Sequence, residues 1–309
     1  MPVIEVQNVK KQYGDRFVVN GVSFSIEPGE IFGIIGPNGA GKTTLVECIA
    51  GLREADSGRI RVLGLDPRGD RAALRPRVGI QLQLSQLPDK IKVWEALDLY
   101  SSFYPNPANW EEILSGLGLQ EKRDATFEKL SGGQKQRLSI ALALAGSPEI
   151  LILDELTTGL DPEARRNIWQ HILAARDRGV TILLVSHFME EAERLCDRLA
   201  MIDGGRLVAL DSPAGIVARA GCEQQVRFRP SAPLDDSLFA GLPEVQRISR
   251  SGDMITVAGT GNLVHAVTSA LARSQIIAHE LRFEQASLDD AFITLTGSNG
   301  HHPTNGGTA

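Results

Sequence analysis

A glycine-rich segment, GPNGAGKTT, stands between an apolar run, IFGII, and a helical stretch, LVECIAGL. It matches the pattern G-x-x-x-x-G-K-[ST] in the strand, loop and helix context that the pattern requires. Glycines let consecutive backbone N–H groups approach an anion, and the helix N-terminus favours negative charge. We therefore expect a cradle for a polyphosphate, in which Lys42 reaches the β- and γ-phosphates and the Thr43 hydroxyl ligates Mg²⁺. This phosphate loop consists of Gly36, Pro37, Asn38, Gly39, Ala40, Gly41, Lys42, Thr43 and Thr44.

Two acids and a histidine follow two further apolar runs. Asp154 and Glu155 end the run EILILDE, and His187 follows VTILLVS. Neighbouring strand residues point to opposite faces, so the two carboxylates must have separate tasks. We expect Asp154 to hold Mg²⁺, directly or through water, Glu155 to deprotonate an attacking water, and His187 to hydrogen-bond the γ-phosphate and that water. The alternative for the acids is a turn or helix cap at a strand exit. For the histidine it is a surface residue.

A second glycine-rich helix start lies in the signature segment, LSGGQ, at residues 130–134. Ser131 as N-cap and Gln134 at the third helical position match a capping box. A capping box leaves Gly132 and Gly133 unexplained, because each glycine costs a helix about 1 kcal/mol relative to alanine. We infer that an anion approaches the backbone there. Since the phosphate loop already covers one side of a nucleotide, these four residues are predicted to contact a nucleotide held by a second subunit.

The apolar runs identify the elements that must position these residues. Short runs that are apolar on both faces are typical of a mainly parallel sheet covered by helices. Residues 3–30 alternate in polarity and predict an antiparallel β edge. The sequence thus predicts an α/β fold in a first domain that ends near residue 221. This domain is expected to contain four apolar strands (31–35, 78–82, 149–153 and 180–186) and a helical insertion (84–130). A small α+β domain (222–297) and a disordered tail (298–309) should follow. In the second domain we expect strands at 224–229, 245–249, 254–258 and 276–283, with helices at 261–273 and 287–296.

Composition excludes several classes of protein. The 309 residues carry a net charge of −6, and 42% of them are apolar, as in ordinary globular proteins. No apolar run approaches the ~18–20 residues of a membrane-spanning helix, and we expect a cytoplasmic chain without a signal segment. Residues 222–309 contain six Arg, no Lys and nine acids, a net charge of 6 − 9 = −3. An acidic chain is a poor candidate for binding nucleic acid, so we expect no nucleic-acid partner.

In order and spacing, the segments GPNGAGKTT, LSGGQ, ILILDE, TTGLDP and SH resemble those of ATP-binding subunits of ABC transporters. The resemblance covers about residues 3–221 and implies a P-loop NTPase core. It also implies that Tyr13 stacks on adenine, that Gln83 senses Mg²⁺ and the lytic water, and that Asp161 lies across a subunit interface. Gln81 competes with Gln83 for that role, although the spacing favours Gln83. Leu156 stands where most relatives carry proline, which leaves the backbone there less constrained.

The end of the second domain, ASLDDAFITLTG, is similar to the tail of exporter subunits of the daunorubicin-resistance type, a group that also serves lipids, polysaccharides and nodulation factors. The alternative is a generic small accessory domain. The resemblance implies an ATPase that uses ATP and Mg²⁺, pairs with a copy of itself or a relative, and energises export of a hydrophobic compound. A separately encoded permease would hold it at the cytoplasmic face of the plasma membrane, with the helical insertion facing that partner. The rival functions are an importer ATPase subunit and a soluble ABC ATPase acting on ribosomes or DNA.

Overall fold

The computed structural model describes residues 1–81 and 87–297. The chain forms two compact units, which divide between Pro213 and Ala214 rather than near residue 221. The difference arises because most of α8 (Pro213–Ala220) groups with the second unit. Gln83, the beginning of the helical insertion and the expected tail lie outside the described residues.

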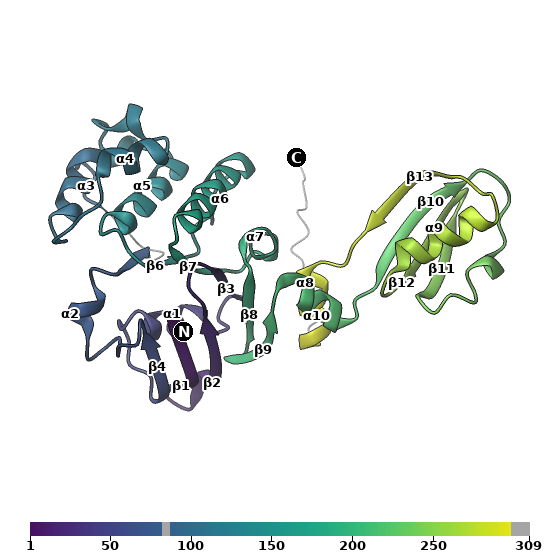
Figure 1. The fold of residues 1–309 in the computed structure, drawn as a ribbon, viewed down its shortest axis with the longest axis horizontal. Coiled ribbons are helices and arrows are strands. Elements are labelled where there is room, and N and C mark those ends of the chain that lie inside the picture. The colour runs from purple at the N-terminus through teal and green to yellow at the C-terminus, as the bar shows by residue number, and fades with distance from the viewer. Residues whose placement is uncertain (82–86, 298–309) are drawn as a thin grey trace. The chain divides into compact units, whose positions relative to one another are not determined.

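A six-stranded sheet forms the centre of the first unit (Figure 1). Its strand order is β5-β6-β7-β3-β8-β9; the first five strands are parallel and the last is antiparallel, so the mainly parallel sheet is confirmed. Every residue of β3, β6 and β7 is buried, as expected for strands covered on both faces. The strands are β3 (Ile31–Ile35), β5 (Val78–Gln81), β6 (Ile150–Asp154), β7 (Thr181–Ser186), β8 (Arg198–Asp203) and β9 (Arg206–Asp211).

An antiparallel sheet of three strands packs beside the central sheet. It consists of β1 (Ile4–Tyr13), β2 (Arg16–Ile26) and β4 (Ser57–Val62), in the order β2-β1-β4. The predicted antiparallel edge is confirmed, whereas β4 was not expected. Phe24 of β2 stacks on Phe32 of β3, with ring centroids 5.0 Å apart, and both rings belong to one apolar core. The two sheets therefore pack against each other through a shared apolar core.

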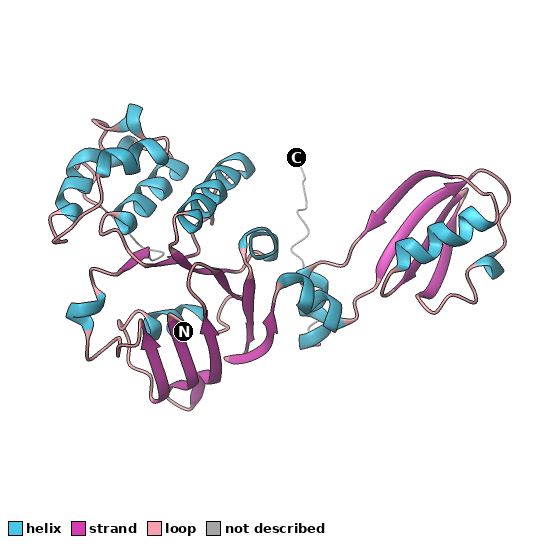
Figure 2. Cartoon of the chain, viewed as in Figure 1, coloured by secondary structure: helices cyan, strands magenta, loops and turns pink. Residues whose placement is uncertain are grey.

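The expected helical insertion contains α3 (Val93–Ser101) and α4 (Trp110–Gly116), with short 3₁₀ turns at Gln120–Lys122 and Phe127–Lys129. Both helices pack against α5 (Gly132–Leu144). Figure 2 shows this helical part of the first unit apart from its strands. The other helices of the unit are α1 (Lys42–Ile49), α2 (Arg71–Leu74), α6 (Pro162–Asp177) and α7 (Met189–Leu195).

The second unit is a small α+β domain, as expected. Its antiparallel sheet has the order β11-β12-β10-β13, and the apolar side of α9 packs on β10 and β12. No helix within residues 1–81 and 87–297 is both long and apolar enough to cross a bilayer. The elements are β10 (Gln224–Pro230), a 3₁₀ turn (Asp236–Leu238), β11 (Val245–Ser251), β12 (Met254–Gly259), α9 (Leu263–Arg273), β13 (Ala278–Glu284) and α10 (Leu288–Thr296).

Candidate nucleotide-binding site

The phosphate loop connects β3 to α1, as the sequence predicts. Two of its glycines are required by close backbone approaches. A Cβ atom at Gly36 would lie 2.0 Å from the carbonyl oxygen of Ile202, and one at Gly41 would lie 2.1 Å from that of Val18. Gly41 is also left-handed, with φ of 99°, and it caps the start of α1. The loop therefore passes close to the backbones of β2 and β8, and a side chain at either glycine would collide with one of them.

Lys42 is buried, with 4% of its surface exposed. Its ammonium donates hydrogen bonds to the carbonyl oxygens of Gly36 (2.8 Å) and Pro37 (3.0 Å). Burial lowers the pKa of Lys42, while the Glu155 and Asp154 carboxylates act in the opposite direction. The structure therefore places this cation inside the loop and within the electrostatic reach of both acids.

Three neighbouring strands bring the predicted catalytic residues to one edge of the sheet. Ile35, the last residue of β3, pairs with Ser186 of β7, and Asp154 of β6 pairs with Val185 of β7. The phosphate loop, the acidic pair and His187 therefore leave the sheet side by side. His187 Nδ1 lies 3.3 Å from Glu155 Oε1.

Asp154 is a buried carboxylate, 1% exposed. Neither of its oxygens has a hydrogen-bond partner of good geometry among the described residues, although Thr43 is close enough to lower its pKa slightly. Burial, and then the charge of Glu155, raise the pKa of Asp154 to about 6. Buried polar groups in proteins normally have partners, so two unpartnered oxygens beside Thr43 fit a ligand such as a hard cation.

Tyr13 ends β1 and is 44% exposed. Two cations lie near its ring, with Lys11 Nζ 5.6 Å and Arg53 Cζ 5.5 Å from the ring centroid. An exposed ring with cations nearby offers a face on which a flat aromatic group can stack.

The signature segment starts α5 as predicted. Ser131 caps the helix, and its hydroxyl accepts from Gln134 N (3.3 Å) while Ser131 N donates to Gln134 Oε1 (3.0 Å). The helix start and the loop before α6 line a shallow pocket of about 300 Å³, which contains no residue of the phosphate loop. It is lined by Ser131, Gly132, Gly133, Arg137, Gly159, Leu160, Asp161, Glu163, Ala164 and Asn167.

The structure gives different explanations for the presence of glycine at the two positions of the signature segment. A Cβ atom at Gly133 would lie 3.3 Å from that of Ala164, so packing within the chain accounts for this glycine. At Gly132 the nearest atom would be Leu160 Cδ2 at 3.9 Å, an ordinary contact. The argument that a close ligand explains both glycines therefore holds only for Gly132, which is exposed.

Asp161 has a partner within the chain. Its carboxylate caps α6 by accepting from Glu163 N (3.0 Å) and Ala164 N (2.8 Å), and Pro162 follows at the first helical position. The residue is exposed at the rim of the pocket beside the signature segment. Its position at that surface is compatible with the predicted contact across an interface.

Comparisons with known proteins agree with this geometry. The sequence profile of the family described as "ABC transporter" matches residues 19–158. Nod factor export ATP-binding protein I of Paraburkholderia xenovorans is 41% identical over 305 residues, which cover 95% of this chain and 97% of the relative. The protein of the same name from Rhizobium etli is 38% identical over 304 residues, 96% of this chain and 94% of the relative.

The chain belongs to the ABC transporter ATP-binding family. ATP binding and ATP hydrolysis are the general activities of this family. A solved ATP-binding subunit of an ABC transporter is 28% identical and covers 71% of this chain and 93% of its own, with a TM-score of 0.65. A dimeric ATP-binding cassette in a post-hydrolysis state, bound to ADP and phosphate, is 25% identical, with a TM-score of 0.61 over 68% of this chain and 98% of its own.

Two features of this ABC ATPase were not predicted from its sequence. Gln136, on the second turn of α5, donates a short hydrogen bond from Nε2 to the carbonyl oxygen of Leu156, directly after Glu155. In the sequence, the signal for Gln136 is its position two residues after Gln134, at the start of the same helix. Glu155 itself has φ of 49°, a left-handed conformation that is uncommon outside glycine. Gln81, the competitor of Gln83, is buried at the end of β5.

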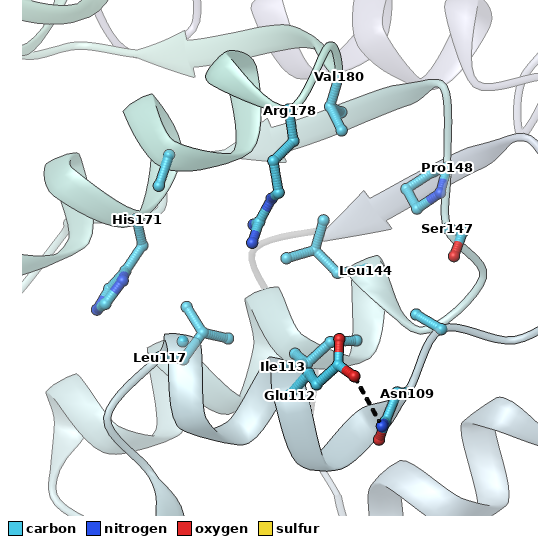
Figure 3. A pocket seen from close by; sticks show the side chains of 13 residues that line it. Asn109, Glu112, Ile113, Leu117, Leu144, Ser147, Pro148, His171, Arg178 and Val180 are labelled. Atoms are coloured by element: carbon cyan, nitrogen blue, oxygen red, sulfur yellow. Dashed lines mark hydrogen bonds between the residues drawn. The ribbon is translucent and has the colours of Figure 1, made fainter.

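Two larger cavities flank the helical insertion. One, of about 800 Å³, lies between the end of α1, α2, β5 and residues 103–105. The other, of about 470 Å³, lies between α4 and α6, and none of the predicted site residues lines it. Figure 3 shows His171 and Arg178 from the α6 side facing Ile113 and Leu117, while Glu112 accepts from Asn109 Nδ2 (3.0 Å). Burial, and then the charges of Arg137 and Arg178, lower the pKa of His171.

Proposed function

We propose that two copies of this chain, or this chain and a relative, enclose two ATP molecules between the phosphate loop of one subunit and the signature segment of the other. The observation that carries the proposal is the separation of the two anion-binding features: the pocket at the start of α5 contains no residue of 36–44. A nucleotide that contacts the exposed backbone at Gly132 would therefore be held by the phosphate loop of another subunit. The dimeric relative with ADP and phosphate supports the same assembly.

Hydrolysis in each site would use the groups at the edge of the central sheet. Glu155 accepts the proton of the attacking water, and His187, 3.3 Å away, orients that water and the γ-phosphate. Lys42 and the backbone N–H groups of the loop stabilise negative charge on the phosphates. The exposed ring of Tyr13 stacks on the adenine.

Mg²⁺ is the cation that the chemistry of this site requires. The unpartnered, buried oxygens of Asp154 and the hydroxyl of Thr43 at the start of α1 fit a hard cation. Within the described residues no group of three His, Cys, Asp or Glu side chains could hold a metal. A site of one carboxylate, one hydroxyl, phosphate oxygens and water suits Mg²⁺, which would neutralise charge on the β- and γ-phosphates.

Conformational changes driven by ATP hydrolysis would act on a separately encoded membrane permease. The 800 Å³ groove combines an apolar wall with Arg71 and Arg75, and Phe103 on its border is 67% exposed. A permease helix with an apolar face and an acidic residue would fit it. Phe103→Asp should abolish co-purification with membranes and leave basal ATPase activity unchanged. Ile277→Asp, at an exposed apolar position of the second unit outside the groove, is the matched control.

Export of a hydrophobic compound is the proposed direction and cargo. The support is that relatives aligned over nearly the whole chain, including the second unit, are named for Nod factor export. Those names favour a cargo similar to a nodulation factor over an antibiotic. Binding to the permease would place the subunit at the cytoplasmic face of the plasma membrane.

The decisive experiment is Glu155→Gln in the presence of MgATP. We expect the variant to bind MgATP with unchanged affinity, to lose turnover and to accumulate as a nucleotide-bound dimer in light scattering. Glu111→Gln, exposed on α4, serves as control. Full turnover in Glu155→Gln would remove Glu155 from the role of base. A monomer with bound MgATP would exclude the proposed sandwich.

A further inference from the structure

Gln136 connects the signature helix to the catalytic loop of the same chain. Its Nε2 donates to the carbonyl oxygen of Leu156, which is the residue after Glu155 and is fully buried. The bond joins the second turn of α5 to the turn that follows β6. A buried carbonyl without its donor carries a desolvation penalty, so this contact fixes how the turn lies against α5.

The same helix start packs on the end of that turn and on the start of α6. Gly133 faces Ala164 so closely that a methyl group would crowd it, and Gly132 faces Leu160. The other side of α5 is held by Arg137, whose Nη1 donates to the carbonyl oxygens of Leu117 (3.1 Å) and Gly118 (3.3 Å). A tilt of α5 is therefore transmitted to both neighbours, because dense packing does not absorb small displacements.

Glu155 depends on this turn for its position. Its backbone N–H donates to Val185 O (2.9 Å), and its carbonyl oxygen accepts from Thr158 N (3.3 Å). Between these two anchors the backbone of Glu155 is left-handed, a conformation that persists only when its surroundings hold it. The carbonyl of Leu156 lies inside the same turn, so the Gln136 contact is one of the restraints that hold it.

We propose that Gln136 is a positioning residue that couples the two nucleotide sites of the dimer. The inference rests on the proposed function: the start of α5 touches the nucleotide of the partner subunit, whereas Glu155 serves the nucleotide of its own chain. Gln136 lies between them on one rigid helix. Arrival of nucleotide against Ser131 and Gly132 then shifts the Leu156 carbonyl and brings Glu155 into line in the other site.

Gln136→Met tests the coupling, because methionine keeps the length of the side chain and removes the donor. We expect the Hill coefficient of wild-type ATPase activity to exceed that of ATP-driven dimerisation measured in the Glu155→Gln background. Gln136→Met should lower kcat about tenfold or more and reduce the Hill coefficient to that of ATP-driven dimerisation alone, since small displacements of a catalytic group have effects of this size. The concentration of ATP that drives dimerisation, measured in the Glu155→Gln background, should stay unchanged.

Gln170→Met, the same change at an exposed position of α6, is the control and should behave as wild type. The inference is overturned if Gln136→Met retains wild-type kcat and cooperativity, if wild-type ATPase activity is no more cooperative than ATP-driven dimerisation, or if Gln136→Met in the Glu155→Gln background no longer dimerises on ATP. Failure of Glu155→Gln alone to dimerise would instead contradict the proposed function, so the two failures are distinguishable.

Discussion

The Nδ1 atom of His187 lies 3.3 Å from Oε1 of Glu155, at the ends of the neighbouring parallel strands β7 and β6. Glu155 is 12% exposed at its side chain and His187 is 24% exposed, so solvent reaches both groups only partly. A water molecule beside the pair could therefore contact both the base and His187. Removal of either member should affect turnover more than ATP binding.

His187→Ala should lower kcat by about 10²–10⁴-fold, the range typical of a lost acid–base or positioning group. ATP affinity, measured with a fluorescent analogue, should change less than about threefold, because the phosphate loop provides most of the contacts. His265→Ala, exposed on α9, is the control. Equal losses of affinity and turnover would show that His187 binds nucleotide rather than supporting the chemical step.

The pKa of Asp154 leads to a prediction about stability. It is raised from 3.8 to about 6 in the folded chain, so at pH 7.5 ionisation of this buried group opposes folding. Asp154→Asn should stabilise the nucleotide- and metal-free protein at pH 7.5 by up to roughly 3 kcal/mol, from about two pKa units at 1.36 kcal/mol each. The gain should diminish as the pH falls from about 6 and vanish near pH 4, where aspartate is protonated in both states.

Denaturant unfolding in EDTA at pH 7.5, 6 and 4 measures this dependence. Asp98→Asn, exposed on α3, is the control and should change stability little at any pH. A gain for Asp154→Asn that is equally large at pH 4 would mean that packing, and not ionisation, explains it. A gain in the free energy of unfolding at neutral pH is expected because a carboxylate buried for function lowers the stability of the protein.

The sequence predicted most of the fold because its signals were local. The four apolar strands, the antiparallel edge and the elements of the second unit lie within a few residues of their expected positions. The strand β4 was missed because SGRIRV contains only two apolar residues, and its pairing with β1 is what stabilises it. Likewise α8 groups with the second unit through tertiary contacts that periodicity does not reveal.

The sequence predicted those parts of the candidate site whose residues lie within one short segment of the chain. The phosphate loop and the capping box of Ser131 follow directly from short patterns. In contrast, Gly133 was assigned to a ligand although it packs on Ala164, 31 residues further along (164 − 133 = 31). The bond from Gln136 to Leu156 spans 20 residues. Only the fold brings such partners together.

The difference between the two signature glycines can be tested by paired substitutions. Gly132→Ala makes only an ordinary contact with Leu160, so it should raise the free energy of unfolding by about 0.5–1 kcal/mol through helix propensity. It should nevertheless reduce ATPase activity about tenfold or more if a nucleotide approaches this backbone in the dimer. Gly133→Ala should lower stability instead, because it crowds Ala164. Wild-type ATPase activity in Gly132→Ala would remove the reason for placing a ligand there.

A mixing experiment examines the sharing of sites between subunits. Lys42→Ala removes the buried cation of the phosphate loop, and Ser131→Arg blocks the start of α5, so each variant alone should be inactive. In a heterodimer of the two, one site combines an intact phosphate loop with an intact signature segment, whereas the other carries both defects. Equal mixing with free exchange gives about half heterodimers, and each has one of two sites, so independent sites would restore about a quarter of wild-type activity, and coupling through Gln136 would restore less.

Thermal unfolding of each variant must first show a folded protein, because Lys42 also bonds to two loop carbonyls. The ATPase rate is then followed while the ratio of the two variants is varied at constant total concentration. A maximum at the equal mixture is the signature of shared sites, since only heterodimers are active. A flat, inactive profile from two folded variants that do form heterodimers would mean that each chain needs its own signature segment, and the sandwich would have to be abandoned.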